Sequence, residues 1–541
     1  MKQWCKDRVV YQIYPRSFQD SNGDGIGDIK GIIRRLPELK ELGIGTIWLS
    51  PLYCSPNADN GYDISDYCNI NPEYGTMADM DALLASAKQL DLKIIMDLVI
   101  NHTSDEHEWF QKSRDKDSEY RDYYIWRPAK ADGKAPNNWT SFFAEDCWEL
   151  DEKSGEYYLH LFAKKQPDLN YRNPKVIEEV KNILRFWLDK GVSGFRCDVI
   201  NVLYKSSLED GKKQMFLLGS EHYISQEGNH EILRELREEV LDKYDCFTVG
   251  ETVFVNTKMG RDLTDTNRHE LDMIFSFEHM ETDQYFVKWF KHRFNAKKFG
   301  QTFERWQNAL EWNANYFENH DQPRSVSRFG NDGKYWEQSA KMLCTMLMSL
   351  RGTPYIYQGE EIGMTNFDFT GMEQLNDVES KNVDTMMKRL HFPHCLRWYL
   401  IKKTSRDNAR TPMQWDTSEN AGFTVGKPWL GINSNYRNIN VEAQKKDPFS
   451  IRSYYRDMIR IRSLSETLRY GSFKLLESDR NVLVYTRKFE GRHATVMLNF
   501  SGRKKRVKYA GQVVISSAGR DSYDGVLMPY EGIILNEGIK L

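Results

Sequence analysis

Short runs of β-branched and aromatic residues alternate with longer stretches of helical period from residue 8 to about residue 360. Each run is short and rich in Val, Ile, Tyr and Phe, which predicts a β-strand. A turn and an amphipathic stretch follow, so the repeating unit is strand, turn and helix. The eight predicted strands cover residues 9–15, 45–50, 93–100, 194–199, 246–251, 271–277, 314–320 and 353–360.

The stretch 173–191 shows the helical half of this unit most clearly. Asn173 is a suitable N-cap, Pro174 suits the first helical position, and Gly191 suits the position just past the end. A predicted strand follows at once. The apolar face of the helix is expected to consist of residues four apart, namely Val176, Val180, Leu184 and Leu188.

Alternation of strands with helices predicts an α/β protein with a parallel sheet. Eight strands are the number that closes into a (β/α)₈ TIM barrel. An open doubly wound sheet is the alternative, but no G-x-G-x-x-G follows the first strand. The sequence therefore predicts a (β/α)₈ barrel.

Three further segments depart from the barrel pattern. Long insertions interrupt it at about 103–171, after strand three, and at about 361–430. From about residue 472 the helical period is replaced by short runs that predict an antiparallel C-terminal β-sandwich. The predicted domains are a barrel (1–102 and 172–470), an inserted domain (103–171) and a C-terminal domain (471–541).

Composition limits the class of protein. The 541 residues have a formal net charge of −3 and no long run of one sign, so we expect neither a nucleic-acid groove nor a membrane-binding patch. The N-terminus lacks the pattern of a signal peptide, and no stretch is apolar enough to span a bilayer. Eight scattered cysteines without a C-x-x-C predict a cytoplasmic protein without a disulfide framework or a zinc site.

Charged and imidazole side chains occur at the ends of the predicted strands. In (β/α)₈ barrels the catalytic groups lie at the C-terminal ends of the strands, so these side chains should meet at one rim. Any one of them alone would more often be structural. Four strands are involved in the pattern, which consists of Asp97, His102, Arg196, Asp198, Glu251, His320 and Asp321.

Carboxylates on neighbouring strands are the groups that glycoside hydrolysis requires. The chain has no nucleophilic serine or cysteine paired with a base, no phosphate-binding loop and no H-E-x-x-H motif. In this chemistry Asp198 must be ionised, and Arg196 beside it should lower its pKa. Glu251 must be protonated, which requires a drier setting that raises its pKa.

Four strand-end motifs and one motif in the insertion identify a family. The chain resembles the α-amylase superfamily, glycoside hydrolase family 13, over essentially its whole length. The branch that it most resembles contains oligo-1,6-glucosidases and dextran glucosidases. The motifs are DLVINHTSD (97–105), QPDLN (166–170), GFRCDVIN (194–201), VGET (249–252) and FENHDQPR (317–324), with DNGYDISDY (59–67), QGEEIGMTN (358–366) and RDNARTPMQWD (406–416) for the branch.

This resemblance implies a retaining, exo-acting α-glucosidase. Asp198 would be the nucleophile, Glu251 the general acid and base, and Asp321 the stabiliser of the transition state. Retention requires the two carboxyl groups to lie about 5–5.5 Å apart. No cofactor would take part in catalysis, and the partner would be a small oligosaccharide bound by a monomer or weak dimer.

The resemblance also assigns residues to binding of the terminal sugar. Tyr62 would stack on the glucose, and His102, His320 and Arg196 would bind hydroxyl groups. Asp59 and Arg410 would bind the hydroxyl groups of the terminal sugar and close the pocket. Arg406, in the same motif as Arg410, is the alternative to it.

Linkage specificity follows from two positions. In this branch the residue after the nucleophile tends to be Val in enzymes that cut α-1,6 bonds and Thr in strict α-1,4 enzymes. This chain has Val199, and Gln166 of QPDLN indicates the same preference. Alternatively, Val199 is only a core residue and has no role in linkage specificity. Lys288 and Glu361 are expected to contact the aglycone.

The segment DSNGDGIGD (20–28) resembles the first part of a calcium loop. An EF-hand would need Glu at its twelfth position, where Gly31 stands, so that assignment fails. In this branch the loop binds a structural cation, Ca²⁺ or Mg²⁺, important for stability and not for chemistry. A solvated turn is the alternative. The implied ligands are Asp20, Asn22, Asp24, Asp28 and the carbonyl of Ile26.

Four rival functions are considered. A trehalose-6-phosphate hydrolase would share the catalytic residues and could use the basic stretch 288–298, and an α-1,4-acting maltase or sucrase would differ only in linkage. A sucrose isomerase would carry an RLDRD-like loop, which 322–332 does not match. A catalytically inactive carbohydrate-binding relative would be expected to have lost the carboxylates.

Overall fold

A computed structural model describes residues 3–143, 145–214 and 216–537. Its largest sheet has eight parallel strands in the order β11-β10-β9-β5-β2-β1-β13-β12. The two terminal strands of this order, β11 and β12, lie against each other, so the sheet curls into a barrel. The bounds are β1 Val10–Ile13, β2 Thr46–Leu49, β5 Lys93–Leu98, β9 Gly194–Cys197, β10 Phe247–Glu251, β11 Met273–Phe275, β12 Ala314–Asn315 and β13 Thr353–Tyr357.

All eight predicted barrel strands are confirmed, and most end earlier than the sequence indicates. Strand β9 ends at Cys197, one residue before Asp198, and β12 ends at Asn315, well before His320. The polar ends of the predicted strands therefore leave the hydrogen-bonded ladder. Their side chains are free to turn toward the rim because the backbone no longer has to stay in the pleat.

Helix α5 (Pro174–Asp189) confirms the predicted helix in detail. The Asn173 side chain accepts a hydrogen bond from the Lys175 N–H, which caps the N-terminus. Gly191 follows the helix at φ +103°, a conformation that glycine adopts at little cost. All four residues of the expected apolar face are buried, namely Val176, Val180, Leu184 and Leu188.

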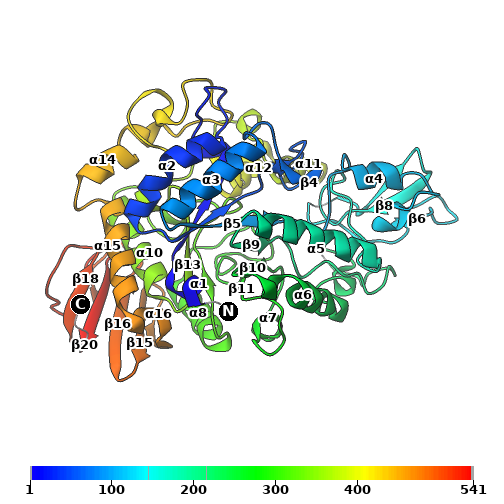
Figure 1. The fold of residues 1–541 in the computed structure, drawn as a ribbon. Helices are drawn as coiled ribbons and strands as arrows, with labels where there is room; N and C mark the ends of the chain where they lie inside the picture. The colour runs from blue at the N-terminus through cyan, green and yellow to red at the C-terminus, as the bar shows by residue number, and fades with distance from the viewer. Residues whose placement is uncertain (1–2, 144, 215, 538–541) are drawn as a thin grey trace.

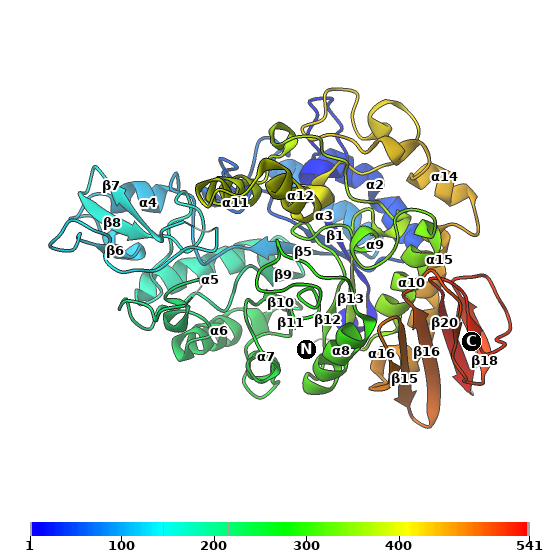
Figure 2. The ribbon, with the colours of Figure 1, turned by 180° about the vertical axis from the view of Figure 1, so that it is seen from behind.

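The segment between β5 and α5 carries a small antiparallel sheet. Its strands are β6 (Trp126–Arg127), β8 (Glu156–Leu159) and β7 (Trp148–Asp151), in that order. Figures 1 and 2 show this sheet and helix α4 (Glu108–Ser113) at one end of the molecule, beyond the N-terminal part of α5. Its apolar cluster includes Val199 from the barrel, so the insertion packs against the rim.

The segment after β13 contributes helices α11 (Val378–Arg389), α12 (His394–Thr404) and α13 (Asp407–Arg410). In both views α11 lies on the side of the barrel that carries the small inserted sheet (Figures 1 and 2). Two insertions far apart in the sequence therefore flank the same part of the rim.

The C-terminal part contains an antiparallel sheet in the order β14-β15-β16-β20-β18 and a separate pair, β17–β19. One face of the sheet packs on α8 (Ala296–Ala309) and α10 (Trp336–Ser349). Figure 1 shows it at the opposite end from the inserted sheet. The predicted domain boundaries stay predictions. The strands are β14 Ser472–Ser478, β15 Val482–Phe489, β16 Arg492–Asn499, β17 Lys505–Arg506, β18 Gln512–Ser516, β19 Val526–Leu527 and β20 Gly532–Glu537.

Across the described ranges, every helix is too short or too polar to cross a membrane.

Candidate active site

The guanidinium of Arg196 joins three carboxylates at the rim. Its Nη1 lies 2.6 Å from Asp97 Oδ1 and 2.6 Å from Asp198 Oδ1, and its Nη2 lies 2.5 Å from Glu251 Oε2. These acids belong to the ends of β5, β9 and β10. Arg196 itself is almost fully buried, so the ion pairs are shielded from water. The charged pair within the apolar run 194–200 therefore organises three neighbouring strands.

The backbone after Asp198 is strained. Val199 has φ +36°, which is unusual for a β-branched residue and costs on the order of 1–3 kcal/mol. Its N–H donates to Glu251 Oε2 at 3.3 Å, and the next N–H, of Ile200, donates to the Glu251 carbonyl at 3.0 Å. The abrupt turn of the chain thus aligns Asp198 with Glu251.

The carboxyl groups of Asp198 and Glu251 form a closely coupled pair. Burial raises the pKa of Asp198 well above its ordinary value, and the charge of Glu251 and a hydrogen bond with it add to this. Arg196 lowers the pKa, as expected, but it is outweighed. Because both carboxyl groups are buried and close together, the protonation of Asp198 depends on the charge of its neighbour.

This proximity distinguishes between the two stereochemical outcomes of glycoside hydrolysis. Inverting enzymes hold their carboxyl groups far enough apart to seat a water beside the sugar. Asp198 and Glu251 each lie within 2.6 Å of the same guanidinium, which holds their carboxyl groups close together. The arrangement is that of a retaining enzyme.

Asp97 is a buried acid to which the sequence analysis gave no role. Burial raises its pKa to about 6, although Arg196 and the Trp48 indole N–H, which donates at 2.9 Å, both favour the charged form. The Tyr62 hydroxyl donates to the same carboxylate at 3.3 Å. Asp97 therefore positions Arg196. Its place as the first residue of DLVINHTSD is the signal that marks it.

His320 and Tyr62 form a second wall of the site. Their rings stack with centroids 5.3 Å apart, and His320 Nε2 lies 2.6 Å from the Tyr62 hydroxyl. The Gln12 side-chain amide lies 2.8 Å from His320 Nδ1, which fixes the ring from β1. Burial lowers the pKa of His320 to about 3, so the ring is neutral. Gln12 was missed because nothing in its neighbourhood marks a site.

A third wall consists of His102 and Gln166. The Gln166 side-chain nitrogen lies 3.1 Å from His102 Nε2 and 3.5 Å from Asp59 Oδ2. His102 Nε2 also lies 3.1 Å from the Tyr62 carbonyl, and burial lowers the pKa of the ring. The predicted residues from strand three and from QPDLN are therefore brought together.

Arg406 and Arg410 form ion pairs with the remaining acids of the site, Asp59 and Asp321. Arg406 Nη2 lies 3.1 Å from Asp59 Oδ1 and Arg406 Nη1 lies 3.4 Å from Asp321 Oδ1. Arg410 Nη2 lies 2.6 Å from Asp321 Oδ1, and Arg410 Nε donates to the His320 carbonyl at 3.0 Å. The cation that pairs with Asp59 is thus Arg406, and Arg410 braces Asp321 instead. The difference arises because the two lie one turn apart on α13.

Two arginines and the His320 ring lie beside Asp321 and determine its protonation. Burial alone would raise the pKa of Asp321, but His320, Arg406 and Arg410 outweigh it and hold the pKa far below the ordinary value. Asp377, the N-cap of α11, lies 2.8 Å from Arg406 Nη2 and anchors it from the second insertion. Sequence reasoning missed Asp377 because no motif surrounds it.

Comparison with known proteins agrees with this geometry. The family model for the alpha-amylase catalytic domain matches residues 12–471. The chain belongs to the alpha-amylase family. An oligo-1,6-glucosidase from Parageobacillus thermoglucosidasius is 53% identical over 510 residues, which cover 92% of this chain and 90% of that protein. A trehalose-6-phosphate hydrolase from Bacillus subtilis is 42% identical over 98% of each chain.

Solved structures show the same likeness. The crystal structure of isomaltulose synthase from Klebsiella sp. LX3 superposes with a TM-score of 0.96 at 41% identity and covers 99% of both chains. The predicted family and the (β/α)₈ fold are therefore confirmed.

In this alpha-amylase family chain a buried ion pair joins the insertion to the barrel. Lys205, from the loop after β9, lies 2.6 Å from Asp168 Oδ2, and both side chains are almost fully buried. Asn101 bonds to both of them and also contacts His102 Nδ1 at 3.2 Å. This network positions His102, and Lys205 was not among the predicted site residues.

The two residues expected to contact the aglycone have different positions. Lys288 Nζ lies 2.5 Å from Glu379 Oε2, and Glu379 lies 3.7 Å from Arg406 Nε, so Lys288 is near the rim. Glu361 is buried and accepts a hydrogen bond from the Tyr11 hydroxyl at 2.8 Å. The assignment of Glu361 as an aglycone contact is wrong, because its buried carboxylate is bonded to Tyr11 of β1 and to the Gly359 N–H.

The loop 20–28 has the oxygen side chains that Ca²⁺ and Mg²⁺ prefer. Within the described part of the chain, however, no group of three or more acidic, His or Cys side chains is arranged to hold a metal ion. The donor chemistry supports a cation, while the carboxylates are satisfied by N–H groups in this conformation. Asp20, Asp24 and Asp28 accept from the backbone N–H groups of Ser21, Asn22, Gly23, Gly25, Ile26 and Gly31.

Proposed function

We propose that the protein is a retaining, exo-acting α-glucosidase that hydrolyses terminal α-1,6-glucosidic bonds of isomaltose and related oligosaccharides. The observation that carries this proposal is the pair Asp198 and Glu251, held on one buried guanidinium at the rim of the barrel. Its close spacing supports a double displacement at the anomeric carbon.

In the first step Asp198 attacks the anomeric carbon and forms a covalent bond to it. The bond from this carbon to the leaving oxygen breaks, and Glu251 donates its proton to that oxygen. In the second step Glu251 accepts a proton from water, which attacks the same carbon and displaces Asp198. Two inversions give glucose with its original α configuration.

The closed end of the pocket supports exo action. Asp59, Arg406 and Asp321 are linked side chain to side chain and bring together segments more than 80 residues apart. We propose that these groups bind the hydroxyls of a terminal glucose, which leaves no path for a longer chain beyond it. Tyr62, Gln166 and His102 would contact the same sugar from the adjoining wall.

Preference for α-1,6 bonds rests on Val199 and on relatives named oligo-1,6-glucosidase at 43–53% identity. Val199 belongs to an apolar cluster with Phe143 and Phe162 of the insertion. A methyl-lined wall beside the nucleophile suits the flexible CH₂–O link of an α-1,6 bond, which presents no hydroxyl there.

Trehalose-6-phosphate hydrolysis is the alternative within the family, since one relative carries that name. It would need free cations near the aglycone. Lys288 is paired with Glu379, and burial lowers the pKa of Lys291 to about 7, so the basic stretch offers less positive charge than its sequence indicates. This favours an uncharged substrate.

A substrate panel tests the proposal. We expect kcat/KM for isomaltose to exceed that for maltose, sucrose and trehalose 6-phosphate by at least about tenfold, which corresponds to about 1.4 kcal/mol of transition-state discrimination. Highest turnover of trehalose 6-phosphate would establish the alternative, and highest turnover of maltose would refute the linkage assignment.

Three finer proposals accompany this function. We propose that the loop 20–28 holds a structural Ca²⁺ or Mg²⁺, as its oxygen side chains suggest. We also propose that the enzyme acts in the cytoplasm, in agreement with eight scattered cysteines that form no C-x-x-C motif. A monomer or weak dimer is sufficient, because all proposed site residues come from one chain.

A further inference from the structure

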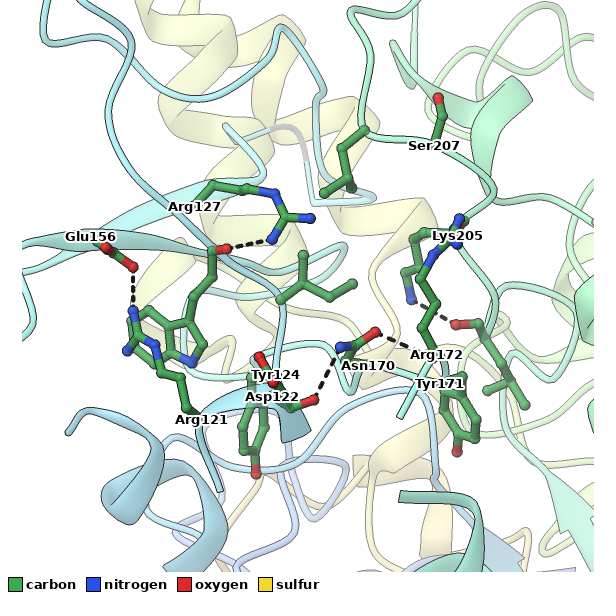
Figure 3. A pocket seen from close by; sticks show the side chains of 14 residues that line it. Arg121, Asp122, Tyr124, Arg127, Glu156, Asn170, Tyr171, Arg172, Lys205 and Ser207 are labelled. Carbon is green, nitrogen blue, oxygen red and sulfur yellow. Dashed lines mark hydrogen bonds and ion pairs between the residues drawn. The ribbon is translucent and has the colours of Figure 1, made fainter. Parts of the chain in front are cut away.

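One arginine beside the proposed active site has no exposed surface and no part in the proposed chemistry. Arg324 ends the motif FENHDQPR, three residues after Asp321. Arg127 and Arg172, whose guanidinium groups lie on opposite sides of a cavity next to the inserted sheet (Figure 3), are by contrast exposed. Burying a guanidinium completely is costly, so the contacts of Arg324 should indicate what it stabilises.

The guanidinium of Arg324 connects three parts of the structure. Its Nη1 lies 3.1 Å from Glu318 Oε1 and donates to the Gln358 carbonyl at 2.6 Å. Its Nη2 donates to the Ala409 carbonyl at 3.1 Å. These partners belong to the loop after β12, to the end of β13 and to helix α13, respectively. Glu318 balances the charge, while the planar fork of N–H groups reaches two separate main-chain segments.

Packing confines the same guanidinium. Its Cζ lies 5.1 Å from the centre of the Tyr357 ring, and its Nη2 lies 3.8 Å from Met364 Sδ. A Cβ placed on Gly359 would come within 3.1 Å of Arg324 Nη1 and within 2.3 Å of the Met364 sulfur. The guanidinium therefore has little freedom to move, and residue 359 must be a glycine.

Ala409 lies between the two arginines at the closed end of the pocket, Arg406 and Arg410. Helix α13 has only four residues, so its own hydrogen bonds are too few to hold it in place. The Ala409 carbonyl accepts from Arg324 and, at 2.9 Å, from the Tyr357 hydroxyl. These contacts tie the helix that carries both arginines to the barrel.

Other contacts hold α13 near its two ends. Ser17 Oγ donates to the Arg410 carbonyl at 2.5 Å, and Asp407 Oδ2 accepts from the Asp377 N–H at 3.0 Å. Arg324 differs from these partners because it belongs to the loop that also carries Asp321. It therefore joins the acid and its two cations through one rigid group.

We propose that Arg324 is a positioning residue, which holds the loop of Asp321 and helix α13 in the arrangement that binds the terminal sugar. It would not touch the sugar, and it acts through Asp321, Arg406 and Arg410. A displacement of about 1 Å at such a site can lower the rate about 10²-fold. The proposal rests on the proposed function, since it assumes that these three residues bind sugar hydroxyls.

Arg324→Lys tests the proposal, because it keeps the charge beside Glu318 and loses the fork that reaches Ala409. Isothermal titration with 1-deoxynojirimycin, an analogue of the terminal glucose, measures binding without turnover. We expect Kd to rise about tenfold, and kcat/KM for p-nitrophenyl α-glucoside to fall about tenfold or more. Tyr357→Phe removes the other donor to Ala409 and keeps the ring, so both changes should be about threefold.

Arg487→Lys is the matched control. Arg487 is also fully buried and also bonds to main-chain carbonyls, at the junction with the C-terminal sheet. This variant should lower Tm but leave Kd and kcat/KM of the folded protein unchanged. A merely structural role for Arg324 would give the same pattern in Arg324→Lys.

Deoxy substrates measure the positioning itself. Removing a glucosyl hydroxyl that Arg406 or Asp321 binds should lower kcat/KM of the wild type, and this penalty should be at least about threefold smaller in Arg324→Lys. An unchanged penalty and an unchanged Kd in Arg324→Lys would overturn the proposal. If that variant does not fold, an unchanged Tyr357→Phe would overturn it. A wild type that hydrolyses no α-glucoside would instead contradict the proposed function, while the titration still tests Arg324.

Discussion

Arg196 contacts three acids from three different strands, and this explains how charges are tolerated in the apolar run 194–200. A buried arginine facing one acid would gain little, since removing both ions from water is costly. Here two nitrogens of the guanidinium contact the carboxylates of Asp97, Asp198 and Glu251. Burial and the repulsion between these acids raise the pKa of Asp198 well above its ordinary value, and the proposed mechanism requires one proton on the pair Asp198 and Glu251.

Replacing either member of this pair gives the first prediction. Asp198→Ala and Glu251→Gln should each lower kcat for isomaltose by about 10³-fold or more, because each removes a group that acts on the reacting bonds. The two variants should behave differently with α-glucosyl fluoride as substrate, because its leaving group needs no proton. Glu251→Gln should form the glucosyl enzyme from it, whereas Asp198→Ala should not.

The pH profile provides the control for that assignment. Burial and the charge of Glu251 raise the pKa of Asp198 in this coupled pair. The alkaline limb of kcat/KM should therefore lie well above the ordinary carboxyl range of about 4. Activity falls as pH rises through this pKa, because the general acid is lost. An alkaline limb that persists unchanged in Glu251→Gln would assign the proton to another group.

Val199 gives a prediction about linkage. Val199→Thr keeps the shape of the side chain and adds a hydroxyl beside the nucleophile, so the ratio of kcat/KM for isomaltose over maltose should fall about tenfold. Val202→Thr is the matched control, because Val202 lies in the same apolar cluster. If both variants shift the ratio equally, or neither shifts it, Val199 is merely a core residue.

At the residue scale the sequence predicted the acids more completely than their partners. Asp198, Glu251 and Asp321 follow recognisable strands and carry motifs. Gln12 and Asp377 have no such signal, because they meet the site only through tertiary packing. The exchange of Arg410 for Arg406 as the partner of Asp59 depends on the direction in which one turn of helix faces, which spacing alone does not give.

At the element scale, helix α5 followed its sequence pattern closely because capping and an apolar face act locally. The strand ends did not, since the point at which a chain leaves a ladder depends on its neighbours. Strand β12 retains only Ala314–Asn315 of the predicted 314–320. The residues that leave the ladder early are those that form the rim, including His320 and Asp321.

The loop 20–28 gives a prediction at this scale. Asp28 caps helix α2 (Ile29–Leu42) by accepting from the Gly31 N–H at 2.7 Å. A cation bound to the folded loop stabilises the protein by mass action, so EDTA should lower Tm by about 2–4 °C and Ca²⁺ should restore it. Thermal scans at several Ca²⁺ concentrations measure this.

Variants make the loop prediction specific. Asp24→Ala should remove the response to Ca²⁺, whereas Asp521→Ala, an exposed acid in the C-terminal part, should retain it. A Tm that is insensitive to EDTA in the wild type would leave the loop as a solvated turn.

At the scale of the whole molecule, the barrel brings together segments that are far apart in the chain. Asp59, Asp321, Asp377 and Arg406 meet at one rim through ion pairs. The number and order of strands predicted the barrel, because eight parallel strands have few alternative closures. The way in which the two insertions cover the rim was not predictable, since it depends on contacts between side chains without local patterns.

The buried pair Lys205 and Asp168 tests this coupling between insertion and barrel. Lys205→Met leaves the Asp168 carboxylate buried without its cation, so unfolding free energy should fall by about 3–5 kcal/mol. The double variant Lys205→Met/Asp168→Leu should lose less. Urea denaturation measures both, with Lys112→Met, from an exposed pair, as the control. Equal stability of Lys205→Met and Lys112→Met would show that the junction does not depend on this pair.

The stereochemistry of the product tests the account most directly. Hydrolysis of isomaltose is followed by proton NMR within the first minutes, before mutarotation mixes the anomers. Two carboxyl groups held close together on one guanidinium predict that the glucose released from the cleaved end appears first as the α anomer. Initial release as the β anomer would mean that water, and not Asp198, attacks the sugar, and would contradict the account.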